Sequence, residues 1–90
     1  MVNSYKLAFT EQAQKDARKI AAAGFKPKVI KLLAILEDNP FQEYPPYEKL
    51  VGDLAGAYSR RINIQHRLVY QVLDEEKIVK VISIWTHCEK

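Results

Sequence analysis

The chain has 90 residues, enough for one domain and too few for two that would each fold alone. Hydrophobic residues make up 48% and charged residues 28%, proportions that exclude an intrinsically disordered or collagen-like chain. The net charge of +3 comes from 14 lysines and arginines against 11 acids. It favours an anionic partner only weakly, since an ordinary basic surface has the same composition.

The residue types also exclude several kinds of site. Cys88 is the only cysteine, so the chain cannot form an internal disulfide. Together with His66 and His87 it supplies too few ligands for a Cys/His metal site. No apolar run approaches the about 18 residues of a membrane-spanning helix, and residues 1–4 have no signal-peptide character. We therefore expect a small, soluble, cytoplasmic protein with no metal, no cofactor and no membrane partner.

The N-terminal half predicts one strand followed by two helices. Residues 4–10 alternate between apolar and polar side chains, which is typical of a half-buried strand. Thr10 can cap the first helix, and Gly24 suits the left-handed position after its last turn. Pro27 can open a second helix, which residues 38–40 end. With so short a connection, the two helices form a hairpin.

The C-terminal half predicts a long loop and three strands. Residues 39–57 hold three prolines and two glycines, and loops of this length are uncommon in compact domains unless they have a function. Residues 58–64, 67–73 and 78–85 are expected to be strands, the last two joined by a polar turn at 74–77. The order β-α-α-β-β-β predicts an α+β fold, an antiparallel four-stranded sheet with the helical hairpin on one face. The other face stays free to carry a site.

Three arginines and a histidine lie between residues 60 and 67, with no acid among them. Arg60 and Arg61 are adjacent on a strand and point to opposite faces, so one could bind a phosphate while the other pairs with a carboxylate. A solvated strand face with weak ion pairs is the alternative that spacing leaves open. His66, at a strand connection, fits a turn residue whose ring the backbone satisfies.

Two further residues could contribute acid–base chemistry. Glu48 lies beside Lys49 in the proline-rich loop and is either half of a local charge pair or, if the loop folds over the sheet, faces the arginines. His87 follows the last strand and could exchange a proton near neutral pH, or be an ordinary terminal residue. Tyr44 and Tyr47, on the same loop, either stack on an RNA base or cover one end of the helix pair.

A long ungapped pattern connects these residues. It consists of Glu48-x-Leu50, Leu54-x-Gly56-x-Tyr58-Ser59-Arg60-Arg61-Ile62, His66-Arg67-Leu68-Val69-Tyr70 and, near the C-terminus, Trp85-x-His87. The pattern resembles the signature of the Txe/YoeB toxins, a family of the RelE superfamily of bacterial toxin–antitoxin systems. The resemblance implies a single RelE-like toxin domain over residues 1–90, and the element order inferred above agrees with that fold.

The resemblance also implies an activity and partners. A member of this family is an mRNA endoribonuclease that works in the ribosomal A site and is neutralised by a YefM/Axe-type, Phd-like antitoxin. Homodimers are known in the family. The family reaction needs no metal or other cofactor: a base removes the proton of a ribose 2′-hydroxyl, which attacks the adjacent phosphate, and an acid protonates the departing 5′-oxygen.

Carried over by position, the resemblance gives roles to individual residues. Glu48 matches the general base, Arg67 the phosphate-stabilising arginine, and His87 the general acid or its support. These three side chains supply the acceptor, the cation and the donor that cleavage by a 2′-hydroxyl requires. Residues expected to bind RNA are Lys49, Tyr58, Arg60 and Arg61. Arg61 is expected to line the RNA groove or to hold the catalytic residues in place.

Cys88 departs from the family pattern, which usually ends His-Tyr. A cysteine at this catalytic or structural position is smaller than tyrosine, cannot stack on a base and is a weaker hydrogen-bond donor. The sequence therefore leaves open a weakened or inactive homologue that only binds its antitoxin, with or without RNA or the ribosome. A third alternative is a general basic RNA-binding module, for which Glu48→Ala would leave function unchanged.

Overall fold

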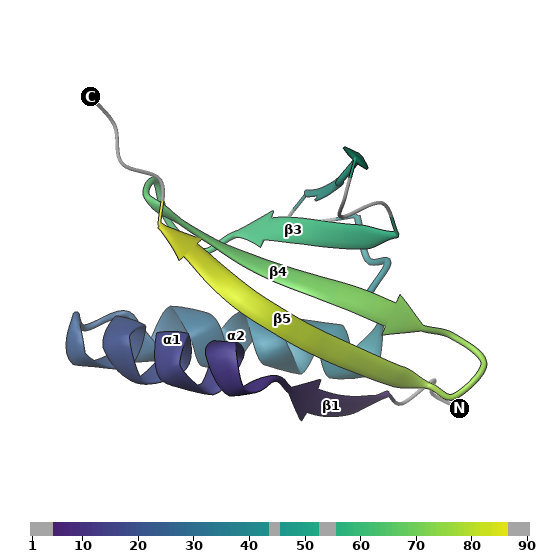
Figure 1. The fold of residues 1–90 in the computed structure, drawn as a ribbon, viewed down its shortest axis with the longest axis horizontal. Helices are drawn as coiled ribbons and strands as arrows, with labels where there is room; N and C mark the ends of the chain where they lie inside the picture. The colour runs from purple at the N-terminus through teal and green to yellow at the C-terminus, as the bar shows by residue number, and fades with distance from the viewer. Residues whose placement is uncertain (1–4, 44–45, 53–55, 87–90) are drawn as a thin grey trace.

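Two helices pack against one face of a five-stranded sheet (Figure 1). The structure is a computed structural model that describes residues 5–43, 46–52 and 56–86. In chain order the elements are β1 (Lys6–Phe9), α1 (Glu11–Ala22), α2 (Lys26–Asp38), β2 (Tyr47–Lys49), β3 (Ala57–Arg61), β4 (His66–Leu73) and β5 (Ile78–Thr86). In this described part of the chain, neither helix is long and apolar enough to cross a membrane.

The ends of the helices follow the expected capping residues. The side chain of Thr10 accepts a hydrogen bond of 3.0 Å from the amide of Ala13, as an N-cap should. Gly24 has φ +92°, a left-handed conformation that glycine adopts without steric cost, so the predicted end of the first helix is confirmed. Pro27 lies in the first turn of α2, where no amide donor is needed.

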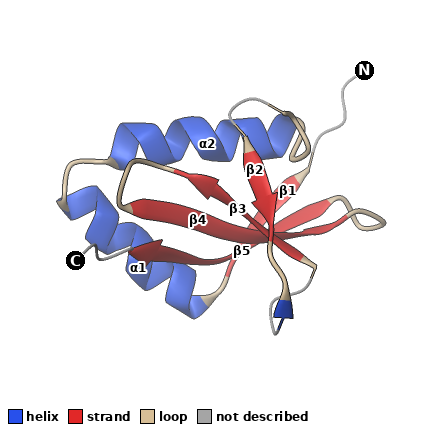
Figure 2. Ribbon diagram, turned by 90° about the horizontal axis from the view of Figure 1, so that it is seen from above, coloured by secondary structure: helices blue, strands red, loops and turns tan. Residues whose placement is uncertain are grey.

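The sheet has the strand order β1-β5-β4-β3-β2. Strands β3, β4 and β5 form the expected antiparallel meander, β1 pairs with β5 in parallel, and β2 pairs with β3 in antiparallel. Figure 2 shows β2 at the end of the sheet, turned strongly from the direction of β4 and β5. The sheet is therefore mixed.

The α+β class is confirmed and the predicted elements follow one another in the expected order, but the prediction of four antiparallel strands was wrong in two respects. Strand β2 is an additional strand of three residues, too short to show any periodicity in the sequence. The second error concerns β1, which pairs with β5 in parallel. Because β2 to β5 alternate in direction, the direction of β5 relative to β1 depends on where the chain enters the sheet again after the helices and the following loop. No hydrophobic pattern encodes that.

The predicted strand over 58–64 ends early, at Arg61. The cause is Asn63, whose side-chain oxygen accepts hydrogen bonds from the amides of Gln65 at 2.7 Å and His66 at 2.9 Å. Such an Asx turn competes with strand pairing and reverses the chain. The ring of His66 lies with Nδ1 3.1 Å from the same oxygen, so its partner is this side chain and not the backbone.

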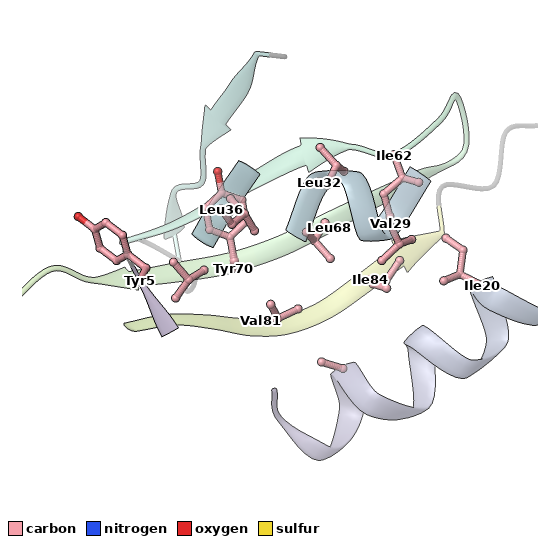
Figure 3. Packing of buried hydrophobic residues seen from close by; sticks show 12 residues of the cluster. Tyr5, Ile20, Val29, Leu32, Leu36, Ile62, Leu68, Tyr70, Val81 and Ile84 are labelled. Atoms are coloured by element: carbon pink, nitrogen blue, oxygen red, sulfur yellow. The ribbon is translucent and has the colours of Figure 1, made fainter. Parts of the chain in front are cut away.

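The core lies between the helices and the strands β4 and β5 (Figure 3). Side chains of β4 and β5 that point toward the helices are almost fully buried; they are Leu68, Tyr70, Val79, Val81 and Ile84. They pack in one cluster with buried residues of the two helices, namely Ala13, Ile20, Val29, Leu32 and Leu36. Because side chains alternate along a strand, Val69 and Lys80, which lie between these positions, face away from the helices. A register shift between Val69 and Tyr70 interrupts the alternation of β5 between Val81 and Ile84.

Strand β1 pairs only with Ile78–Val81, so the second half of β5 has an edge next to α1. Two side chains bind the backbone there. The hydroxyl of Thr10 donates to the carbonyl of Ile82 at 2.6 Å, and the carboxylate of Asp16 accepts from the amide of Ile84 at 3.0 Å. These bonds fasten α1 to β5 and occupy backbone groups that an exposed edge would present to other chains.

Removing the hydroxyl of Thr10 tests this attachment. Thr10→Ala should lower the free energy of unfolding by about 1–2 kcal/mol, because it removes both the N-cap and the bond to Ile82. The measurement is equilibrium urea unfolding followed by far-UV circular dichroism. Thr10→Ser keeps the hydroxyl and should recover most of the loss; equal losses in the two variants would contradict the assignment.

Candidate active site

A carboxylate and a guanidinium meet on the face of the sheet away from the helices. Nη1 of Arg67, at the start of β4, lies 3.2 Å from Oε1 of Glu48 on β2 and 3.0 Å from Oγ of Ser59 on β3. The sheet register explains the arrangement. Strand β3 lies between β2 and β4, and its residue Ser59 is directly opposite Glu48. This part of the loop therefore joins the sheet as an edge strand and does not fold over it, and from there Glu48 faces an arginine.

The pair borders a surface pocket of about 390 Å³, whose lining residues are Pro46, Glu48, Ser59, Arg61, Ile62 and Arg67. The side chain of Glu48 is 66% exposed and that of Arg67 is 29% exposed, so a ligand in the pocket can reach both. Arg61 is exposed and directly opposite Arg67 in the register. Two guanidinium groups against one carboxylate give the pocket a positive balance that suits an anion such as phosphate.

Arg60 points the other way, as the adjacent strand positions predict. It is fully buried, and its Nη2 donates to the carbonyls of Pro40 at 2.9 Å and Gln42 at 2.7 Å. Its Nε donates to the hydroxyl of Tyr70 at 3.0 Å, and its guanidinium lies 4.9 Å from the centre of the Tyr47 ring. The structure thus places Arg60 beneath the surface, holding the 40–42 loop and β2 to the sheet, and we leave it out of the RNA-binding surface.

Tyr70 is suited to be the neutral acceptor of this bond. Burial raises the pKa of the Tyr70 hydroxyl above its ordinary value, while the positive charge of Arg60 opposes that shift. The phenol therefore stays protonated at neutral pH and accepts from Arg60 without forming an ion pair.

Two of the expected RNA-binding residues also lie on the face opposite the pocket. Tyr58 is half-buried in an aromatic cluster, 5.8 Å from Phe41, 5.5 Å from Tyr47 and 5.9 Å from Tyr70 between ring centres. Lys49 is exposed and directly opposite Tyr58 in the register, so the two share a face. Tyr47 is part of the same aromatic cluster.

The remaining expected residues, Tyr44, His87 and Cys88, lie outside the described residues. The last described residue, Thr86, is opposite His66 in the register, so β5 ends beside the start of β4. Among the described residues, no group of three or more His, Cys, Asp or Glu side chains could hold a metal ion.

Sequence reasoning gave no role to Ser59, which nevertheless contacts the arginine of the site. The signal for it was present in the alternation of β3, because Ser59 and Arg61 are two positions apart and so share a face. Pairing the 58–64 and 67–73 segments as a hairpin would have placed that face beside Arg67.

Comparison with known proteins decides the family. A family model described as the ParE toxin of the type II toxin–antitoxin system parDE matches residues 7–90. The toxin YoeB of Streptomyces coelicolor is 33% identical over 76 residues, which cover 82% of this chain and 90% of that protein. The chain belongs to the YoeB family of toxins. The resemblance carried by the Glu48–Tyr70 run is thereby confirmed.

Solved structures agree with this assignment to the YoeB family. A YoeB/ParE toxin from Agrobacterium tumefaciens is 32% identical and superimposes with a TM-score of 0.80, covering 92% of this chain and 99% of that one. The YoeB of Staphylococcus aureus, solved as a dimer, is 33% identical with a TM-score of 0.78, over 94% and 99% of the two chains. Its complex with YefM superimposes with a TM-score of 0.75 at 33% identity, over 93% and 98% of the two chains.

The opposite roles of the adjacent arginines can be separated by unfolding measurements. Arg60→Met should lower the free energy of unfolding by about 2–4 kcal/mol, because it removes the buried donor of hydrogen bonds to the Pro40 and Gln42 carbonyls and to the Tyr70 hydroxyl. Urea unfolding monitored by circular dichroism gives the value.

Arg61→Met is the matched control, since it removes the same group from the neighbouring exposed position. Its effect should stay within about 0.5 kcal/mol. A loss as large as that of Arg60→Met would show that the guanidinium of Arg61 also supports the fold.

Proposed function

We propose that this YoeB-family toxin is a ribosome-dependent endoribonuclease that cleaves mRNA in the A site and so inhibits translation. The observation that carries the proposal is the Glu48–Arg67 pair, open to solvent in a basic pocket on the helix-free face of the sheet. It brings together the acceptor and the cation that cleavage by a 2′-hydroxyl needs. In this proposal residues 1–90 act as one toxin domain in the cytoplasm, where the ribosomes are.

Glu48 acts as the general base. Its exposed carboxylate accepts the proton of the ribose 2′-hydroxyl, and the 2′-oxygen forms a bond to the adjacent phosphorus. A base in this position contributes about 10²- to 10⁴-fold to the rate. So modest a factor fits an enzyme that depends on the ribosome to hold its substrate in place.

Arg67 and Arg61 bind the oxygens on which negative charge develops. Nη1 of Arg67 is held by Ser59 on one side, which orients the guanidinium toward the pocket. As the phosphorus–O5′ bond breaks, an acid protonates the leaving oxygen, and His87 is the residue that the family resemblance offers for this step. The products are a 2′,3′-cyclic phosphate and a 5′-hydroxyl, with no metal or other cofactor.

We further propose a YefM/Axe-type antitoxin as the protein partner, because the S. aureus YoeB is solved in complex with YefM. An acidic segment of that antitoxin would cover the pocket and engage Arg61 and Arg67. Homodimerisation is proposed on the same ground, since that YoeB is also solved as a dimer.

Cys88 supports one alternative function. If the side chain expected at this position is a tyrosine that positions substrate or transfers a proton, then a thiol weakens catalysis. The chain would then bind its antitoxin, with or without RNA or the ribosome, and not cleave.

The proposal is tested by in vitro translation of a defined message, followed by primer extension to map cuts. The native chain should cut within the A-site codon, and Glu48→Gln and Arg67→Gln should each lower the cleavage rate about 10²- to 10⁴-fold. Both variants should keep the far-UV circular dichroism of the native chain, because neither side chain belongs to the core.

Glu75→Gln is the matched control, since it neutralises an exposed carboxylate in the β4–β5 turn, and its cleavage rate should be unchanged. A cut that persists in Glu48→Gln would exclude Glu48 as the base. No cut by the native chain, with a cut by Cys88→Tyr, would replace the proposal by the weakened homologue, and no cut by either would favour binding alone.

A further inference from the structure

Trp85 is the only tryptophan of the chain, and it lies at the exposed end of β5. Its neighbour Ile84 is 8% exposed and belongs to the core, so the alternation of the strand turns the indole to the helix-free face. The residue is 41% exposed. Trp85 is therefore on the same face as the candidate active site.

The sheet register sets Trp85 directly opposite Arg67. Side chains at directly opposite positions of antiparallel strands have their Cβ atoms about 4.5–5.5 Å apart, so the indole lies beside the stem of the arginine. On the other side of Arg67, its guanidinium reaches Ser59 and Glu48. The order across this face is therefore carboxylate, guanidinium and aromatic ring.

An exposed tryptophan alone would carry no conclusion, because single apolar residues are common on protein surfaces. The context of this ring is more specific. Two tyrosines expected at the RNA surface, Tyr47 and Tyr58, are packed against each other and against Phe41 on the opposite face. Tyr44, the other tyrosine considered for stacking, lies outside the described residues. Among the described residues, the indole of Trp85 makes no ring–ring contact.

We propose that Trp85 is a base-stacking subsite of the toxin: its indole stacks on the nucleobase of a single-stranded RNA nucleotide whose phosphate is bound by Arg67. In a nucleotide, one ribose separates the base from its phosphate. That separation fits an aromatic ring and a guanidinium carried by directly opposite residues of neighbouring strands. The proposal rests on the proposed function in taking RNA as the ligand, and it assigns to Trp85 the contact with the base. Stacking tolerates every base, so the subsite contributes affinity more than sequence preference.

The fluorescence of the single tryptophan reports on this contact directly. The probe is a single-stranded RNA of mixed sequence with 2′-O-methyl riboses, which binds without being cleaved. Saturating the protein with this RNA should quench the fluorescence emission of Trp85. An oligomer of the same length with abasic riboses should bind through its phosphates, as seen by competition, without quenching.

The affinities of variants are compared by the fluorescence anisotropy of a fluorescein-labelled probe. Trp85→Leu keeps an apolar side chain without a ring and should weaken binding roughly 10- to 100-fold, whereas Trp85→Phe should keep most of the affinity. Phe9→Leu alters another exposed ring, on β1, and should have no effect.

The outcomes separate this subsite from the proposed function. Quenching that persists in Glu48→Gln supports the subsite even if that variant and the native chain cut no message. Binding of the probe without quenching, or equal affinities of Trp85→Leu and the native chain, would overturn it. Quenching by an acidic antitoxin peptide but not by RNA would assign the ring to the protein partner. Quenching that depends only on protein concentration would assign it to a second copy of the chain.

Discussion

The buried guanidinium of Arg60 is the constraint on which the geometry of the site depends. A charged group taken out of water is tolerated only when its donors are satisfied, and Arg60 finds acceptors in the 40–42 loop and in the hydroxyl of Tyr70. Its face contacts the ring of Tyr47, the first residue of β2. A three-residue edge strand has little stability of its own, so these contacts fix where β2 lies. Glu48, the next residue, is thereby held opposite Ser59.

Strand alternation then divides one short run into structural and chemical halves. Arg60 points toward the helices and is fully buried, while Ser59 and Arg61 line the pocket on the other face. Arg67 enters the same face from β4 because it is directly opposite Arg61. The rigid meander of β3, β4 and β5 therefore presents the side chains of the site, and only Glu48 comes from the edge strand. Mounted on strands of one sheet, these groups need little reorganisation to meet a substrate.

The sequence predicted what local chemistry determines. Thr10, Gly24 and Pro27 mark helix ends because caps, left-handed positions and first turns have strong residue preferences. The meander was predicted from alternation, but β2 was missed, because three residues show no period, and so was the parallel pairing of β1. Alternation placed Arg60 and Arg61 on opposite faces without saying which face the helices cover. Only the packed structure decides that.

The site followed the same division. From the residues alone, Glu48 could either pair locally with Lys49 or face the arginines across a groove, because the spacing of residues does not determine the conformation of a loop. The family resemblance named Glu48 and Arg67 together, and the fold brings their side chains to 3.2 Å. It also named Tyr58 and Arg60, which the fold turns to the other face. A family signature contains residues that support the fold as well as residues that bind substrate. It therefore does not distinguish a buried structural arginine from a substrate-binding one.

The contact between Glu48 and Arg67 has a consequence for control of the proposed toxin. With both side chains partly exposed, such a pair contributes only about 0–1 kcal/mol, so an incoming anion can replace the carboxylate with little cost. In the proposed reaction, a phosphate that binds Arg67 would release Glu48 to accept a proton, so the base would become available when substrate is present. An acidic antitoxin segment would compete for the same guanidinium without supplying a 2′-hydroxyl. Substrate binding and neutralisation would thus depend on one arginine, which makes them mutually exclusive without any change in the fold.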